Sequence, residues 1–191
     1  MGKILIIDNY DSFTYNLFQL VKQVSDDEVE VHRNDKISVE DCENYDKIIL
    51  SPGPGLPDEA GNLKEIIKAY SGKKPIFGVC LGLQAIGEVF GASLKNLSRV
   101  YHGIRTEFQS TTPVDPLFKD IPERFFAGRY HSWVIDSNTL PDSLEVICVD
   151  DDGEIMGIAH KEHNTKAVQF HPESVMTDHG KEMLTNFLNL T

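Results

Sequence analysis

The fold is decided by the stretch Gly78-Val79-Cys80-Leu81-Gly82, which places a cysteine between two glycines. An apolar run over residues 75–79 predicts a strand that leads into it, and a helical pattern follows it. A cysteine in this setting is typical of a nucleophile elbow, a sharp strand-to-helix turn at the carboxyl edge of a sheet. The positive end of the following helix favours the thiolate. The alternative is a small apolar residue that ends a central strand.

The first half of the chain alternates between strand and helix patterns. Asp11 and Ser12 are good N-caps for the first helix, which carries a stripe of apolar residues. Short apolar runs predict strands at residues 3–7, 29–31, 47–50 and 75–79, and helices at 63–70 and after Cys80. Repeated βα units predict an α/β fold with a doubly wound, mostly parallel open sheet of the flavodoxin-like kind.

The second half has a different character. It predicts short strands at residues 123–136, 144–149, 154–160 and 166–170, with a hairpin turn at Asp152-Gly153. A last helix carries Met183, Leu184, Phe187 and Leu188 on one face. Because no linker or repeat interrupts the chain, we expect a single domain, residues 1–191, with a small antiparallel addition.

Composition excludes several classes of function. A net charge of −12 argues against nucleic acid and anionic membrane surfaces, which need clustered lysine and arginine. No apolar run reaches the length of a membrane span. Three widely spaced cysteines indicate a reducing compartment, so the chain is expected to be cytoplasmic. No zinc or calcium motif has the right spacing, so neither a metal nor another cofactor is expected.

A cysteine nucleophile needs a base, and His171 is the best candidate among seven histidines. The segment His171-Pro172-Glu173 follows a predicted buried strand, and proline favours extended backbone at the residue before it. Positions two residues apart in an extended segment face the same way. Glu173 can therefore accept a hydrogen bond from one ring nitrogen of His171, which leaves the other nitrogen for sulfur. The remaining histidines are expected at the surface, in loops or, for His131 and His160, at strand ends.

The stretch Ser51-Pro52-Gly53-Pro54-Gly55 follows the third predicted strand. A phosphate-binding loop would need a series of backbone N–H donors, which Pro52 and Pro54 lack. What remains is a stiff loop that presents the amides of Gly53 and Gly55. Together with the N–H of Leu81, the residue after the nucleophile, it predicts an oxyanion hole. The alternative is an ordinary proline-glycine turn.

Together these motifs resemble the class I (triad) glutamine amidotransferases. The resemblance rests on the elbow, the loop at residues 51–55 and Gln169-Phe170-His171-Pro172-Glu173, and it covers essentially the whole chain. The opening stretch at residues 8–16, DNYDSFTYN, resembles a narrower group, the glutaminase subunits of anthranilate synthase and aminodeoxychorismate (para-aminobenzoate) synthase.

The resemblance implies roles for individual residues. Cys80, His171 and Glu173 would be the catalytic triad, and Gly53 and Leu81 the oxyanion hole. The substrate L-glutamine would be held by Gly53, Pro54, Gly55, Gln84, Ser132 and Trp133. Since the chain ends at Thr191, soon after the triad, we expect the acceptor chemistry on a separate chain. The family implies a chorismate-using synthase subunit that receives ammonia without its passing through solvent.

Three departures from the family pattern and two alternatives accompany this interpretation. Trp133 stands where leucine is usual, Leu83 stands where a polar residue or methionine is common, and Ile104 replaces the lysine of a usual His-Gly-Lys stretch.

A stand-alone cysteine γ-glutamyl hydrolase or peptidase could use the same fold and triad. A flavodoxin-like binding module would make Cys80 dispensable. The choice between the two chorismate pathways, or both, stays open.

Overall fold

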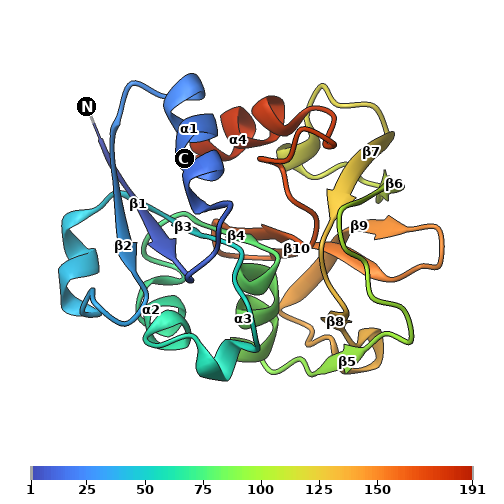
Figure 1. Ribbon diagram of the computed structural model, residues 1–191, viewed down its shortest axis with the longest axis horizontal. Coiled ribbons are helices and arrows are strands. Elements are labelled where there is room, and N and C mark those ends of the chain that lie inside the picture. Colours follow the sequence, from blue (N-terminus) through green and yellow to red (C-terminus); the bar gives the residue numbers. More distant parts are fainter. Residues whose placement is uncertain (1, 191) are drawn as a thin grey trace.

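A nine-stranded sheet forms the centre of the molecule in the computed structural model, which describes residues 2–190 (Figure 1). One half of the sheet is parallel. Its strands, in their order across the sheet, are β2 (Glu28–Arg33), β1 (Lys3–Asp8), β3 (Lys47–Leu50), β4 (Ile76–Val79) and β11 (Thr165–Val168). This order and direction agree with the flavodoxin-like fold predicted from the sequence.

Apolar side chains cover both faces of the parallel half, because β1, β3 and β4 are apolar at successive positions. Ile4 and Ile6 point to one face and Leu5 and Ile7 to the other, and each face has its own buried cluster. Figure 1 shows helices on both sides of the sheet. The helices are α1 (Thr14–Val24) and α4 (Gly180–Leu188) on one face, and α2 (Leu63–Tyr70) and α3 (Leu81–Val89) on the other.

The other half of the large sheet is antiparallel and extends from β11. Its strands, in their order across the sheet, are β10 (Ile155–His160), β9 (Leu144–Asp150), β6 (Ile104–Ser110) and β7 (Arg124–Arg129). The predicted turn at Asp152-Gly153 joins β9 to β10, with Gly153 in the left-handed region at φ 78°. The antiparallel addition was predicted, but β6 was not, because its sequence mixes polar and charged residues with only two large apolar ones.

Two predictions of local structure were wrong. The single strand expected over residues 123–136 is broken at 130–132, and its second part, β8 (Trp133–Ile135), pairs with β5 (Leu94–Asn96) in a separate two-stranded sheet. Asp11 does not cap α1, which begins at Thr14 after Phe13. Instead, Asp11 Oδ1 accepts a hydrogen bond from the N–H of Phe13 at 2.6 Å and forms the turn before the helix.

Among residues 2–190, four short 3-10 helices complete the fold: η1 (Glu40–Asn44), η2 (Pro57–Glu59), η3 (Pro116–Phe118) and η4 (Ser137–Thr139). Within residues 2–190, each helix is too short or too polar to cross a bilayer. The arrangement that matters for function is the order of the central strands. Neighbouring strands β3, β4 and β11 end at the same edge of the sheet, and each is followed by one of the predicted functional segments.

Candidate active site

Cys80 occupies the turn between β4 and α3 in a strained conformation, with φ 52° and ψ −99°. Few residues other than glycine adopt a positive φ, and such strain is concentrated at functional sites. Its backbone is fixed on both sides, because its N–H donates to Val168 O at 2.9 Å and its carbonyl accepts from Gln84 N at 3.1 Å. The predicted strand-to-helix turn is therefore present, with the sulfur at the carboxyl edge of the sheet.

Gly78 and Gly82 are needed at the elbow because there is no room for a side chain there, and not because of their dihedral angles. A Cβ on Gly78 would lie 2.7 Å from the backbone carbon of Gly82, and one on Gly82 would lie 2.9 Å from Leu50 Cβ. The elbow is thus packed tightly between β3 and the first turn of α3. Any larger residue at either position would displace Cys80.

His171 and Glu173 are both buried and lie together, as their spacing predicted. His171 Nδ1 donates a hydrogen bond to Glu173 Oε1 at 2.7 Å, because a carboxylate can only accept. The backbone N–H of His171 is held by Gly128 O at 3.0 Å. The aromatic rings of Phe13 and Tyr130 flank the imidazole at 5.7 and 4.8 Å between ring centroids. The ring is therefore fixed from several sides.

The free nitrogen of His171 interacts with Cys80. Within residues 2–190, Nε2 makes no hydrogen bond of good geometry, yet the sulfur lies near enough to act on the titration of the ring. Burial lowers the pKa of His171, but the nearby Cys80 and the hydrogen-bonded carboxylate of Glu173 outweigh it, and the net pKa is raised. This environment favours the imidazolium form of His171, which can donate a proton from Nε2.

The loop after β3 brings Gly53 against the elbow. Asn9 fixes the start of this loop, since its N–H donates to Ser51 Oγ at 2.9 Å and its Nδ2 donates to Ser51 O at 2.8 Å. A Cβ on Gly53 would lie 2.6 Å from Asn9 Cβ and 2.7 Å from Leu81 Cδ2, so no side chain fits there. Leu81 is the first residue of α3, and its N–H has no acceptor inside the helix. The structure therefore places Gly53 and Leu81 side by side beside Cys80.

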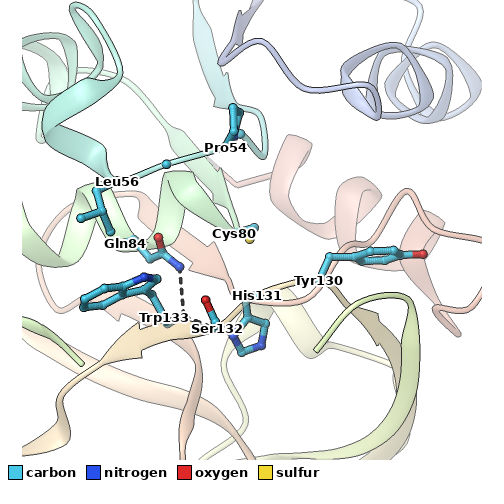
Figure 2. A pocket seen from close by; sticks show the side chains of 10 residues that line it. Pro54, Leu56, Cys80, Gln84, Tyr130, His131, Ser132 and Trp133 are labelled. Carbon is cyan, nitrogen blue, oxygen red and sulfur yellow. Dashed lines mark hydrogen bonds between the residues drawn. The ribbon is translucent and has the colours of Figure 1, made fainter. Parts of the chain in front are cut away.

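A cavity of about 290 Å³ opens on one side of Cys80 (Figure 2). All six residues that the family resemblance assigned to glutamine binding line it. The lining consists of Gly53, Pro54, Gly55, Leu56, Cys80, Gln84, Tyr130, His131, Ser132 and Trp133. Trp133, the departure from the family pattern, contributes its backbone carbonyl to a hydrogen bond from Gln84 Nε2 at 3.0 Å. We call this space the first cavity.

A second cavity of about 520 Å³ is also lined by Cys80. It is lined by Tyr10, Asp11, Ser12, Phe13, Pro52, Gly53, Pro54, Cys80, His102, Tyr130 and His171. Cys80, Gly53, Pro54 and Tyr130 are common to both cavities, whereas His171 lines only the second. Cys80 therefore lines both cavities, and His171 faces one of them.

Sequence reasoning missed a buried polar group behind the first cavity. Arg129, at the end of β7, is 2% exposed, and its Nη1 donates to Asp150 Oδ2 at 3.0 Å. Its Nε donates to His131 Nε2 at 3.2 Å, and the guanidinium lies 3.5 Å from the centroid of the Tyr101 ring. His131 was expected merely at a strand end. The only sequence signal was that Arg129 stands inside the predicted strand at 123–136, next to Tyr130-His131.

Gln169 is the second residue whose contacts were missed. It was part of the motif that carried the resemblance, but no role was predicted for it. It is fully buried, and its Nε2 donates to Cys80 Sγ at 3.3 Å. Its position just after β11, beside the end of β4, explains this proximity, because those strands are neighbours in the sheet.

Fold and site together define a doubly wound α/β protein with a cysteine at a strained strand-to-helix elbow. The family description "Glutamine amidotransferase class-I" matches residues 5–190. The chain is 45% identical to the aminodeoxychorismate/anthranilate synthase component 2 of Bacillus subtilis, over 97% of this chain and 95% of that protein. This protein belongs to the class-I glutamine amidotransferase family.

Two further comparisons place the chain within the family. It is 46% identical to the bifunctional protein TrpGD of Thermotoga maritima, over 100% of this chain but only 32% of that longer protein. Among solved structures, a provisionally assigned GMP synthase subunit from Thermoplasma acidophilum superposes with a TM-score of 0.88 at 26% identity, covering 98% of this chain and 92% of that one. These relatives do not favour the stand-alone hydrolase or the non-enzymatic alternative.

Proposed function

We propose that this chain hydrolyses L-glutamine to glutamate and ammonia and delivers the ammonia to a chorismate-using synthase on a separate chain. The observation that carries the proposal is the meeting of Cys80, His171 and Gly53 at one edge of the sheet, after three neighbouring strands. The name of the Bacillus relative supports the acceptor, since that protein is a component 2 for aminodeoxychorismate and anthranilate synthesis. We further propose that residues 1–191 act as one domain in the cytoplasm, which suits its three unpaired, buried cysteines.

The first half-reaction forms a thioester. The Cys80 thiolate attacks the side-chain amide carbon of glutamine, and a carbon–sulfur bond forms while the carbonyl oxygen gains the negative charge. The N–H groups of Gly53 and Leu81 stabilise that oxyanion. As the carbon–nitrogen bond breaks, His171 gives its Nε2 proton to the leaving nitrogen, which departs as ammonia.

The second half-reaction regenerates the enzyme. His171, now neutral at Nε2, takes a proton from water as the oxygen attacks the thioester carbon, and the carbon–sulfur bond breaks to release glutamate and the thiolate. Glu173 holds Nδ1–H throughout, so that the same nitrogen, Nε2, gives and then receives the proton.

The first cavity takes the amino-acid end of glutamine. We assign this binding to Gly53, Pro54, Gly55, Gln84, Ser132 and Trp133, because they line the cavity that ends at the sulfur. Both hydrogens of Gln84 Nε2 are engaged, with Trp133 O at 3.0 Å and Gln169 Oε1 at 3.4 Å. Gln84 therefore offers its Oε1, an acceptor that suits the substrate's α-ammonium group.

The second cavity gives ammonia its exit. Because His171 lines only this cavity, the nitrogen that it protonates leaves on this side of the sulfur. Tyr10, on the rim, is 47% exposed, and its backbone adopts a left-handed conformation at φ 61°. An exposed aromatic side chain on a strained turn fits a surface that a partner covers. We assign the mouth of the second cavity to the synthase partner.

The test uses the full chain with a chorismate-using synthase recovered from the same source. Cys80→Ser should abolish product formation from glutamine while leaving product formation from added ammonium salt intact. Mass spectrometry of the product, anthranilate or aminodeoxychorismate, then identifies the pathway. Equal loss with both nitrogen sources would contradict the assignment of Cys80. A synthase that neither binds this chain nor accelerates its glutaminase activity would overturn the partner assignment.

A further inference from the structure

A buried amide outside the triad contacts the nucleophile. Gln169 Nε2 lies 3.3 Å from Cys80 Sγ, and the side chain is completely buried. Its backbone N–H donates to Met156 O at 2.9 Å, which holds this segment beside β10. The mechanism described above does not use this group, although it touches the reacting atom.

The direction of the Gln169 amide is fixed by its neighbours. The two ends of an amide have the same shape, so partners must decide which end faces the sulfur. The carbonyl of Trp133 can only accept, and it therefore takes an N–H of Gln84. The second N–H of Gln84 is then directed to Gln169 Oε1 at 3.4 Å. With its oxygen facing Gln84, Gln169 presents its N–H to Cys80.

A second hydrogen bond to the Trp133 carbonyl, from His131, is consistent with this orientation of the Gln169 amide. Arg129 can only donate, so His131 Nε2 accepts from it, and His131 Nδ1–H donates to Trp133 O at 3.2 Å. Burial, followed by the charge of Arg129, lowers the pKa of His131 to about 3, so this ring stays neutral with one donor and one acceptor. Gln84 and His131 thus both donate to the Trp133 carbonyl. Reversing any hydrogen bond in the series from Arg129 to Cys80 would leave a buried polar group unpaired.

We propose that Gln169 is a catalytic residue whose amide N–H stabilises the Cys80 thiolate, with Gln84 setting the direction of that amide. Hydrogen bonds to a charged acceptor are about twice as strong as neutral ones. The bond is therefore strongest when sulfur is anionic, before attack and again when the thioester breaks. The proposal rests on the proposed function only through the role of Cys80 as the nucleophile.

The decisive variant is Gln169→Met, which keeps the length of the side chain but removes its donor. Iodoacetamide alkylation of Cys80 in the full chain, without glutamine, is measured against pH by mass spectrometry. The midpoint of the alkylation profile should move to higher pH, and the rate near neutral pH should fall roughly tenfold. The kcat for glutamine should fall by a comparable factor, with KM nearly unchanged.

Two variants serve as controls. Gln109→Met makes the same chemical change on β6, outside both cavities, and should leave the profile unchanged. Cys80→Ser measures the background from Cys42 and Cys148, which are buried. If Gln169→Met fails to fold, as judged by circular dichroism, Gln169→Glu replaces it. A carboxylate there repels the thiolate and should move the midpoint to higher pH.

Gln84→Met tests the directing role, and should move the midpoint in the same direction by a smaller amount. An unchanged profile for this variant would refute the part assigned to Gln84. Unchanged profiles for folded Gln169→Met and Gln169→Glu would overturn the proposal altogether. A wild-type chain that hydrolyses no glutamine would instead overturn the proposed function, since alkylation requires no substrate.

Discussion

The parallel and antiparallel halves of the large sheet contribute to the site in different ways. Strands β3, β4 and β11 of the parallel half lead directly into Gly53, Cys80 and His171, so the proposed reacting groups come from the ends of neighbouring strands. The antiparallel half contributes the wall of the first cavity, from the break between β7 and β8. Regular strands thus position the proposed catalytic groups. The wall of the first cavity comes instead from the break between β7 and β8, which buried ionic and polar side chains support.

The largest effect is expected from the parallel half. His171→Ala removes the proton donor and acceptor of both half-reactions, and should lower kcat for glutamine by roughly 10²–10⁴-fold. Steady-state assays with glutamine and with ammonium salt separate the two activities. Ammonia-dependent synthesis by the assembled complex should be unaffected, because this chain would not act on the acceptor. A loss that is restricted to KM would contradict the role of His171.

A large effect on stability is expected from the antiparallel half. Asp150→Asn leaves the buried Arg129 charge without its partner and should lower the free energy of unfolding by about 3–5 kcal/mol. Urea denaturation measures it. The matched control is Asp178→Asn, which breaks a half-exposed pair with Arg105 and should cost no more than about 1 kcal/mol. Similar losses in the two variants would remove the distinction between buried and surface pairs.

A moderate effect is expected when Glu173 loses its charge but keeps its size and shape. Glu173 helps to raise the pKa of His171, so Glu173→Gln should lower that pKa. The imidazolium would then be lost at lower pH, and the basic limb of the kcat/KM profile should shift toward neutral pH. The pH profile for glutamine hydrolysis shows this directly. A shift of that limb to higher pH would mean that Glu173 does not stabilise the charged ring.

The smallest effect concerns His131, whose pKa is lowered to about 3 in the folded chain. The unfolded chain binds this proton near pH 6.5, so between these values it holds more protons and stability rises with pH. His131→Asn keeps a donor for Trp133 O but lacks this titration. Its free energy of unfolding should therefore fall less steeply as pH decreases from about 6 to 4, by up to about 1.4 kcal/mol per unit. Parallel curves would contradict a neutral, buried His131.

The parallel half was largely predictable from the sequence because its signals are local. Strand β4, the two glycines and Cys80 are contiguous, and His171 and Glu173 lie two residues apart. Only the geometry of parallel strands was needed to bring these segments to one edge. The residues assigned to the first cavity followed from the family resemblance, and the structure does line the cavity with them.

The antiparallel half was less predictable because its determinants are distant in sequence. Arg129 is buried only because Asp150, on another strand, neutralises it, and no local pattern reports such a pairing. The break after Arg129 moves Trp133 into a second sheet, although strand propensity continues through the region. Gln169 was read as part of a motif, but its contact with sulfur depends on the register of β11 beside β4.

Cys80 lines both cavities, and this has a consequence for the order of events. Under the proposed function, a γ-glutamyl group bonded to Cys80 would lie at residues that line both the first and the second cavity. Another glutamine could react only after water has cleaved that bond, so ammonia would leave before glutamate in every cycle.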